Sequence, residues 1–237
     1  MNKTSLLTTI KFTVKNIIER PNIVAKFNYD IYWSDKRKSR PFLSSFQKAR
    51  AELVSGFLTQ GSKVLDIGSG DGSVAKYLSR KSGCELVCSD FSDKALEFLK
   101  EQGLNTLKLK AETNYSEVAR KNKINTITFL EVLEHLPDPE RVLKEASNAV
   151  DTVIFSVPNS GYISHRLRLL FGKFPMQWRL HPGEHLRFWT LSDMKWWLIQ
   201  LEYKNVKVLT YEGFPILNKI APSIFSRGII VVLRPPG

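Results

Sequence analysis

Cysteine is scarce in this chain, which has two in 237 residues. Cys84 and Cys88 lie around an expected strand, where residues four apart share a face at a separation of roughly 13 Å. That separation is too long for a disulfide bond. We therefore expect both to be small buried apolar side chains rather than a disulfide or metal ligands.

Long apolar runs are also missing. No stretch approaches the roughly 18 uninterrupted apolar residues of a membrane-spanning helix, which excludes such a helix. Residues 1–10 carry one lysine and a weak apolar patch, without the small-residue cleavage site of a signal peptide. We expect a cytoplasmic protein.

Acidic residues are outnumbered by basic ones, and the formal net charge is +12. The excess is concentrated in residues 1–50 and 166–173. A basic surface favours polyanions or anionic membranes, although a solvated face that keeps the protein soluble explains it equally well. With 43% apolar and 24% charged residues, the composition is that of a soluble globular protein, and the length fits one α/β domain with additions.

A glycine-rich turn at residues 64–72, VLDIGSGDG, organises the chain. Residues 64–67 have the pattern of a buried parallel strand, and residues 73–80 follow a helical pattern. The glycines let backbone approach a ligand, and the helix start offers free N–H groups. Ser73 replaces the third glycine of the dinucleotide-binding pattern, and no P-loop lysine follows. We expect the first half of a nucleotide-binding βαβ unit of another kind.

This stretch resembles motif I of the class I S-adenosylmethionine-dependent methyltransferases. Asp66, Gly68, Gly70 and Gly72 all fall on the pattern of that motif. The resemblance implies S-adenosylmethionine as the cofactor, in a site that includes Asp66, Gly68, Ser69 and Gly70.

A second strand, expected at 85–89, ends at Asp90. A carboxylate there, about 20 residues beyond the glycines, accepts hydrogen bonds from both hydroxyls of a ribose. Phe91 beside it is placed to pack on an adenine. Family members commonly bind the adenine amino group with an aspartate after the third strand, but Lys110 occupies that place. Glu112, two residues beyond, is the predicted substitute.

Leu130 ends a fourth expected strand, at 124–130, and completes the predicted cofactor site. The sequence that follows at 131–145, EVLEHLPDPERVLKE, resembles motif IV and its sequel in the type 11/23 subgroup, which contains the ubiquinone-biosynthesis O-methyltransferases. At 156–175, SVPNSGYISHRLRLLFGKFP resembles the matching region of MetW-like methyltransferases.

Further strands are expected at 152–157, 204–211 and 228–233. Their alternation with helices predicts an α/β fold with a doubly wound sheet. The resemblance implies the seven-stranded Rossmann-like methyltransferase fold, with its last strand antiparallel between the fifth and the sixth. We expect a helical N-terminal lid at 1–60 and a cofactor-binding core at 61–237. An insertion at 160–190 is expected on the acceptor side.

His135 is the expected general base, with Glu131 beside it in the predicted catalytic pair. The unperturbed pKa of a histidine is near neutrality, and His135 follows the carboxyl end of the fourth strand, where ligands bind in such sheets. It would remove the proton of an acceptor hydroxyl. A histidine that only hydrogen-bonds the backbone is the alternative, and Glu131 would then contact the methionine part of the cofactor.

A metal site is a second interpretation of the same region. Glu131, Glu134 and His135 have the i, i+3, i+4 spacing that places side chains on one side of a helical turn. His185 lies in a segment expected to fold back over the same edge of the sheet, although it alternatively serves only to hold that segment. Two carboxylates and two imidazoles suit Mg²⁺ or Mn²⁺. The set is similar to the metal site of small-RNA 2′-O-methyltransferases.

The acceptor stays open among three classes. A small-molecule or lipid- or sugar-linked acceptor, with peripheral membrane contact, agrees with the basic amphipathic segment at 165–174. RNA agrees with the charge and the metal set, although no recognised RNA-binding module is present. A non-catalytic regulator similar to some MetW-like proteins is the third class, and the intact motif I with Asp90 weighs against it. The oligomeric state is open as well.

Overall fold

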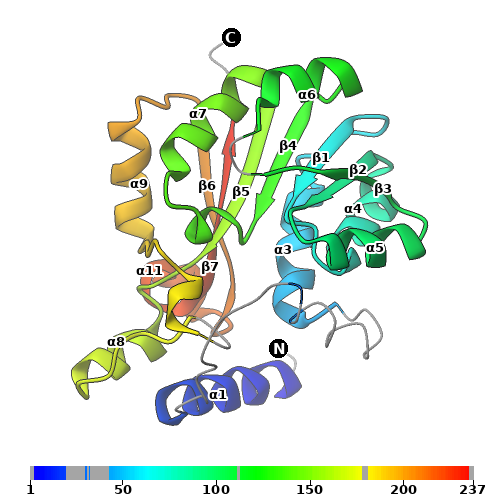
Figure 1. Cartoon of the computed structure of the whole chain (residues 1–237). Coiled ribbons are helices and arrows are strands. Elements are labelled where there is room, and N and C mark those ends of the chain that lie inside the picture. The colour runs from blue at the N-terminus through cyan, green and yellow to red at the C-terminus, as the bar shows by residue number, and fades with distance from the viewer. Residues whose placement is uncertain are drawn as a thin grey trace.

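The computed structural model describes residues 3–19, 30, 32, 43–110, 113–177 and 181–234. Seven strands form one sheet: β1 (Lys63–Ile67), β2 (Glu85–Asp90), β3 (Asn105–Lys108), β4 (Thr126–Leu130), β5 (Thr152–Pro158), β6 (Val206–Gly213) and β7 (Ser226–Leu233). Their order is β3-β2-β1-β4-β5-β7-β6 (Figure 1). β1 to β5 run parallel, and β7 is antiparallel to both β5 and β6. The predicted doubly wound sheet, with its inserted last strand, is confirmed.

Helices cover both faces of the sheet and one end of it (Figure 1). They are α1 (Lys3–Ile18), α3 (Ser45–Ser55), α4 (Ser73–Ser82), α5 (Asp93–Glu101), α6 (Tyr115–Asn122), α7 (Pro139–Ala149), α8 (Ile163–Leu170), α9 (Leu191–Gln200), α10 (Leu217–Ile220) and α11 (Pro222–Phe225). Side chains define several starts, such as Ser44 at α3 and Thr190 at α9, each in a capping box. None of the described helices is long and apolar enough to cross a bilayer.

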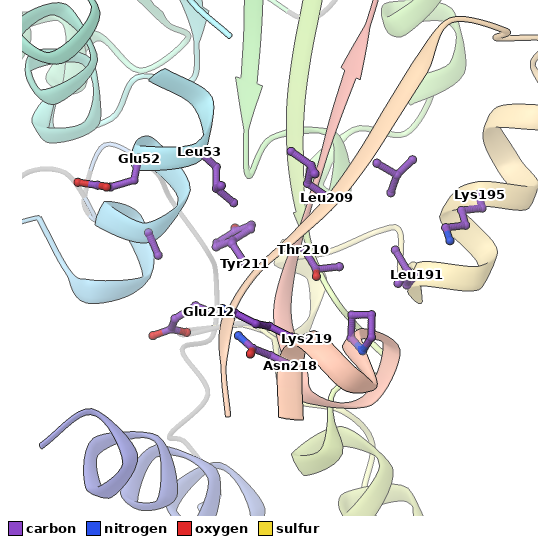
Figure 2. A pocket seen from close by; sticks show the side chains of 13 residues that line it. Glu52, Leu53, Leu191, Lys195, Leu209, Thr210, Tyr211, Glu212, Asn218 and Lys219 are labelled. Atoms are coloured by element: carbon purple, nitrogen blue, oxygen red, sulfur yellow. The ribbon is translucent and has the colours of Figure 1, made fainter. Parts of the chain in front are cut away.

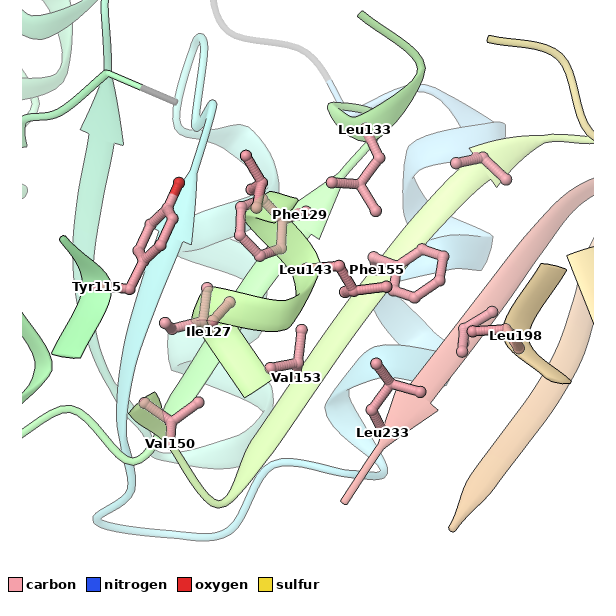
Figure 3. Packing of buried hydrophobic residues seen from close by; sticks show 14 of the residues in the cluster. Tyr115, Ile127, Phe129, Leu133, Leu143, Val150, Val153, Phe155, Leu198 and Leu233 are labelled. Carbon is pink, nitrogen blue, oxygen red and sulfur yellow. The ribbon is translucent and has the colours of Figure 1, made fainter. Parts of the chain in front are cut away.

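Apolar side chains on the two faces of the sheet form separate clusters. One cluster packs strand residues such as Phe129 and Phe155 against α6, α7 and α9 (Figure 3). The other packs alternate strand residues, among them Ile154 and Ile230, against α3, α4 and α5. Because both faces are covered, the central strands are buried on both sides, and all five residues of β4 are buried. Polar side chains with a chemical role are thereby confined mainly to the strand ends.

α1 and α8 pack against each other beyond the carboxyl ends of the parallel strands (Figure 1). Buried Arg168 of α8 joins them, because its Nη1 donates to the carbonyl oxygens of Asn16 at 2.7 Å and Glu19 at 3.1 Å. The hydroxyls of Thr13 and Tyr162 are 2.9 Å apart across the same contact. α3, by contrast, packs on the sheet, in the apolar cluster that it shares with α4 and α5. The two described helices of the first 60 residues, α1 and α3, therefore contribute to two different layers.

A few elements differ from expectation. The third strand, expected at 105–110, stops at Lys108 as β3, because its neighbour β2 ends at Asp90, directly opposite. α6, α10 and α11 are additional helices, and Asn114 caps α6 by accepting from the N–H of Glu117, a signal that the sequence carries. Both cysteines are free and buried, as predicted.

Candidate functional site

A cavity of about 1360 Å³ lies at the carboxyl ends of β1, β2 and β4, the edge where doubly wound sheets bind ligands. Its walls come from the turns after these strands, from α1, α3 and α8, and from the segment before α9. The predicted site residues in its lining are Asp66, Gly68, Ser69, Gly70, Asp90, Phe91, Leu130, Glu131, Glu134, His135 and His185. Every described residue of the predicted site therefore borders one cavity.

The glycine turn after β1 brings backbone close to this cavity. The N–H groups of Gly68 and Ser69 both donate to the carbonyl oxygen of Ser89, at 2.8 and 2.9 Å, which ties the turn to β2. Gly68 has a φ of +73°, and a Cβ atom there would lie 2.7 Å from Val132. Both the conformation and the close approach require glycine.

The Asp66 side chain holds the glycine turn in place through hydrogen bonds. Its carboxylate accepts hydrogen bonds from the hydroxyl of Thr128 at 2.6 Å and from that of Ser69 at 2.8 Å. Burial raises the pKa of Asp66, and the two hydroxyl donors oppose the rise. Asp66 thus joins β1 to β4 and to the glycine turn.

Asp90 ends β2 with its carboxylate beside the turn. Oδ2 accepts from the N–H of Gly70 at 3.2 Å, and Oδ1 from that of Ser92 at 3.0 Å. Burial raises the pKa of Asp90, while these backbone donors lower it. The carboxylate is therefore held in one orientation at the cavity wall.

The adenine side of the predicted site is less enclosed. Phe91 is 52% exposed, while Leu130 is buried, and both border the cavity. Lys110, which stands at the family's aspartate position, lines the cavity too. Glu112 lies outside the described residues.

The backbone at Glu131 differs from the helical turn that the sequence spacing predicts. Glu131 has a left-handed φ of +63°, and a short 3-10 turn begins only at Leu133. The prediction of one continuous turn to His135 is wrong, because the N–H of Glu131 is held by Ser156 of β5, with its carbonyl oxygen at 3.0 Å and its hydroxyl oxygen at 3.1 Å. Glu131 therefore extends the sheet contact and faces different partners from Glu134.

The Glu131 carboxylate lies in a buried polar cluster. Oε1 accepts from the hydroxyls of Ser156 at 2.9 Å and Tyr211 at 3.0 Å, and it lies 3.3 Å from Nη1 of Arg50. Burial and the charge of Glu131 raise the pKa of Tyr211 well above its usual range. Burial disfavours the charge of Arg50, but Tyr211 and Glu131 raise its pKa above the usual value. The cluster thus contains a charged guanidinium.

Arg50 is absent from the predicted site. It lies in α3, is only 5% exposed, and borders the cavity, and its Nε has no hydrogen-bond partner. A sequence signal for it exists, since Phe46, Arg50 and Val54 follow one another at i, i+4, i+8 along the packed face of the helix. A basic residue at the same helical spacing as apolar residues indicates that its side chain is buried.

Glu134, His135 and His185 form a group of metal-ligand types, with one ligand atom from each within 4.8 Å of the others. Glu134 is 1% exposed, and neither carboxylate oxygen has a hydrogen-bond partner. Burial, with Glu131 adding, raises the pKa of Glu134 well above its usual range. Burial lowers the pKa of His135 and, with His135 nearby, that of His185 to about 3. A carboxyl group in this place is neutral or is paired with a bound cation.

The hydrogen bond of His135 assigns its tautomer. Nδ1 contacts the carbonyl oxygen of Glu184, and a carbonyl oxygen only accepts, so Nδ1 carries the hydrogen. Nε2, which is 4.0 Å from Oε1 of Glu134, is then the basic nitrogen. A neutral imidazole thus presents a lone pair at Nε2.

The segment that carries His185 folds back over this edge of the sheet, as predicted. The N–H groups of Leu186 and Arg187 donate to the carbonyl oxygen of Glu134, at 2.8 and 3.1 Å. The N–H of Ser160 donates to the carbonyl oxygen of Trp189 at 2.9 Å. These bonds fix His185 against the turn after β4.

A second hollow, of about 610 Å³, lies beside β6, between α3 and α9 (Figure 2). Tyr211 lines this hollow, and its hydroxyl donates to Glu131, which borders the first cavity. Glu52, Lys195 and Asn218 also border the hollow. None of the described residues of the predicted site borders this hollow.

Comparisons with known proteins agree with this geometry. A family model described as a methyltransferase domain matches residues 37–208. A ubiquinone biosynthesis O-methyltransferase of Alkalilimnicola ehrlichii is 28% identical, over 79% of this chain and 81% of the relative. A protein of the same name from Pseudomonas putida is 26% identical, over 89% and 96%. The structure of a SAM-dependent methyltransferase from Archaeoglobus fulgidus superposes with a TM-score of 0.60 at 17% identity, over 88% of this chain and 100% of that one.

Proposed function

Since the chain belongs to the methyltransferase domain family and depends on S-adenosylmethionine, we propose that it methylates a hydroxyl oxygen on a small or lipid- or sugar-linked acceptor. The names of the two O-methyltransferase relatives support oxygen as the atom that is methylated. The observation that carries the proposal is one cavity bordered by the glycine turn, by Asp90 and by the neutral imidazole of His135.

Residues on two sides of the cavity would hold the two polar ends of the cofactor. Asp90 accepts hydrogen bonds from the ribose hydroxyls, and Phe91 packs on the adenine. Arg50 binds the carboxylate of the methionine end, because it is a buried cation with an unpartnered Nε at the cavity wall. Glu131, 3.3 Å from Arg50, is a positioning residue for that guanidinium.

His135 is the base that removes the proton of the acceptor hydroxyl. When bound, S-adenosylmethionine supplies a methyl carbon made electrophilic by its sulfonium. Nε2 would take the hydroxyl proton, and the bound cofactor would supply the methyl group to the acceptor oxygen and leave as S-adenosylhomocysteine. Burial lowers the pKa of His135, which keeps the imidazole neutral at physiological pH and ready to accept.

Calorimetry with S-adenosylhomocysteine tests the cofactor site. Asp90→Asn is expected to weaken binding at least about tenfold, through lost ribose contacts. Asp93→Asn is the matched control, because Asp93 is an exposed aspartate three residues later that pairs with Lys108. Equal affinities of both variants and the unmodified protein would contradict the site.

A divalent cation is a second proposal for the same cavity. The fit rests on Glu134, whose two buried oxygens lack hydrogen-bond partners beside two neutral imidazoles. Glu134, His135 and His185 would hold Mg²⁺ or Mn²⁺, which would lower the pKa of the acceptor hydroxyl. His135 is then a ligand rather than the base.

Binding of Mn²⁺, followed by electron paramagnetic resonance, tests the cation directly. His185→Gln is expected to weaken binding at least about tenfold. His181→Gln is the matched control, since His181 lies outside the group and its Nδ1 accepts from Gly183. No bound Mn²⁺, with methyl transfer indifferent to chelator, would leave His135 as the base.

Peripheral contact with an anionic membrane is a third proposal. α1 carries a stripe of exposed apolar side chains, and α8 with its following loop and α10 carry more at the same end of the molecule (Figure 1). They are Leu7, Ile10, Val14, Ile18, Leu169, Leu170, Phe171, Phe174, Ile216, Leu217 and Ile220. Lys11, Lys15, Lys173 and Lys219 lie among them, which favours an anionic bilayer. The cavity is bordered by α1 and α8, so it lies next to this surface.

Flotation with vesicles of phosphatidylglycerol and phosphatidylcholine tests this contact. Leu170→Ser with Phe171→Ser is expected to lower binding to the anionic vesicles at least about fivefold. Ile199→Ser is the control, because Ile199 is 68% exposed on α9, away from this surface. Equal binding of all variants, or no binding, would overturn the membrane contact.

A further inference from the structure

The cavity extends beyond the residues that hold the cofactor. Asn16 of α1, His165 of α8 and Gln177, seven residues beyond α8, border it as well. We call this region the α1–α8 end of the cavity. It draws on segments about 150 residues apart in the chain, and Arg168 links two of them through the carbonyl oxygen of Asn16. None of these side chains takes part in the cofactor contacts described above.

Each of the three segments presents one buried polar atom without a hydrogen-bond partner. The atoms are Oδ1 of Asn16, Nδ1 of His165 and Nε2 of Gln177. Their side chains are otherwise anchored: Nδ2 of Asn16 donates to Met176 at 3.4 Å, and Oε1 of Gln177 accepts from Ser160 at 3.2 Å. Asn16 and His165 are each 8% exposed. Buried polar groups in proteins are nearly always paired, so three unpaired atoms in side chains that border one cavity point to a ligand that pairs with them.

The charge of this end decides what that ligand is. Burial, with Arg168 and Arg227 adding, lowers the pKa of His165 to about 4, so its imidazole is neutral near pH 7. The guanidinium of Arg168 is engaged by main-chain carbonyl oxygens, with Nε 2.8 Å from Phe174 and Nη1 2.7 Å from Asn16. Arg227 forms an ion pair with Glu212. The described cations here are already engaged, which disfavours an anionic ligand.

The unpaired atoms also set the hydrogen-bond pattern. Oδ1 of Asn16 accepts, Nε2 of Gln177 donates, and a neutral imidazole nitrogen does one or the other according to tautomer. A hydroxyl group both donates and accepts, and it carries no charge. We propose that the α1–α8 end binds a neutral, hydroxyl-rich part of the methyl acceptor, in the chemical class of a saccharide or polyol. This inference rests on the proposed function, since it names the acceptor class for the same cavity.

Binding of free sugars to the full chain loaded with S-adenosylhomocysteine tests the proposal. The probes are neutral hexoses and their uronic acids at millimolar concentrations, followed by saturation-transfer NMR. A neutral hexose is expected to bind, and Asn16→Leu and Gln177→Leu are each expected to weaken it about tenfold, the loss of one hydrogen bond to a buried group. Asn122→Leu is the matched control, because Asn122 lies on α6 and donates to Val118.

The outcomes separate this inference from the proposed function. S-adenosylhomocysteine binding that persists in all variants, without binding of any hexose, overturns the saccharide site and leaves the methyltransferase proposal standing. Stronger binding of uronic acids than of neutral hexoses overturns the neutral class. Failure of S-adenosylhomocysteine to bind the unmodified protein overturns the cofactor site first. Gln177→Leu keeps the test decisive if Asn16→Leu misfolds, since Gln177 lies outside the helices and strands.

Discussion

Nη1 of Arg168, on α8, donates a hydrogen bond of 2.7 Å to the carbonyl oxygen of Asn16, in the last turn of α1. The same nitrogen reaches the carbonyl oxygens of Ile17 at 3.3 Å and Glu19 at 3.1 Å. The last carbonyl groups of a helix have no partner within it, so Arg168 supplies one from another element. One side chain thereby holds α1 at the cavity.

Arg168→Met is expected to loosen α1 without unfolding the sheet. The substitution removes Nη1, the donor to the last carbonyl groups of α1, at a cost of about 1–3 kcal/mol. Hydrogen exchange of the amides in α1 should accelerate about tenfold or more, while β1 and β4 stay protected. Arg166→Met is the control, since Nε of Arg166 bonds within its own turn to Gly161. Unchanged exchange in α1 would contradict the role of Arg168.

Gly68→Ala is expected to destabilise the protein more than Gly61→Ala. Both glycines have a positive φ, of +73° and +76°, so both substitutions carry similar backbone strain. Only at Gly68 would the new Cβ meet a neighbour, Val132 at 2.7 Å, whereas nothing lies within 4 Å at Gly61. Thermal unfolding should show an additional loss of about 1–3 kcal/mol for Gly68→Ala. Equal melting temperatures would argue against the close approach.

Arg50→Met is expected to weaken S-adenosylhomocysteine binding more than about tenfold, by removing the cation for the methionine carboxylate. Calorimetry measures the affinity, and circular dichroism checks that the variant is folded. Lys48→Met, two residues earlier on α3 and without a place in the cavity lining, should bind normally. An unchanged affinity in Arg50→Met would assign Arg50 a structural role beside Glu131 only.

The stability of the protein is expected to fall as the pH drops from 7 to 4, partly through His165. Its pKa is lowered to about 4 in the folded protein, so the unfolded chain, with a pKa of about 6.5, binds the proton more readily. The neutral His165 stabilises the fold fully above pH 6.5. This contribution is lost as the pH falls from 6.5 to 4, by about 3 kcal/mol at most. Urea unfolding of His165→Gln should show a smaller loss than the unmodified protein or His181→Gln. Parallel losses in all three would contradict this role.

The predicted cofactor side of the site follows from local sequence because its determinants are local. Asp66, Gly68 and Gly70 lie within five residues, and their spacing alone requires a strand, a tight turn and a helix start. Asp90 is one βα unit further on, where the parallel register with β1 brings it beside the turn. No long-range packing has to be known to place these residues.

The geometry of the predicted catalytic side follows from sequence only in part. The spacing of Glu131, Glu134 and His135 predicts one helical face, yet the N–H of Glu131 donates to Ser156, 25 residues away, and this bond turns Glu131 out of that face. The burial of Arg50 depends on how α3 packs against the sheet. Such features come from contacts between distant segments, which no local pattern records.

The position of β7 between β5 and β6 has a consequence for assembly on the ribosome. β6 is made first but has β7 as its sheet neighbour among the described strands, so it has no edge to join until Ser226–Leu233 emerges. The edge of β5 that pairs with β7 likewise stays unpaired until β7 is made. Nascent chains interrupted before β7 would therefore expose the open edge of β5 and the unpaired strand β6 at once, which makes prematurely terminated products strong candidates for aggregation and chaperone capture.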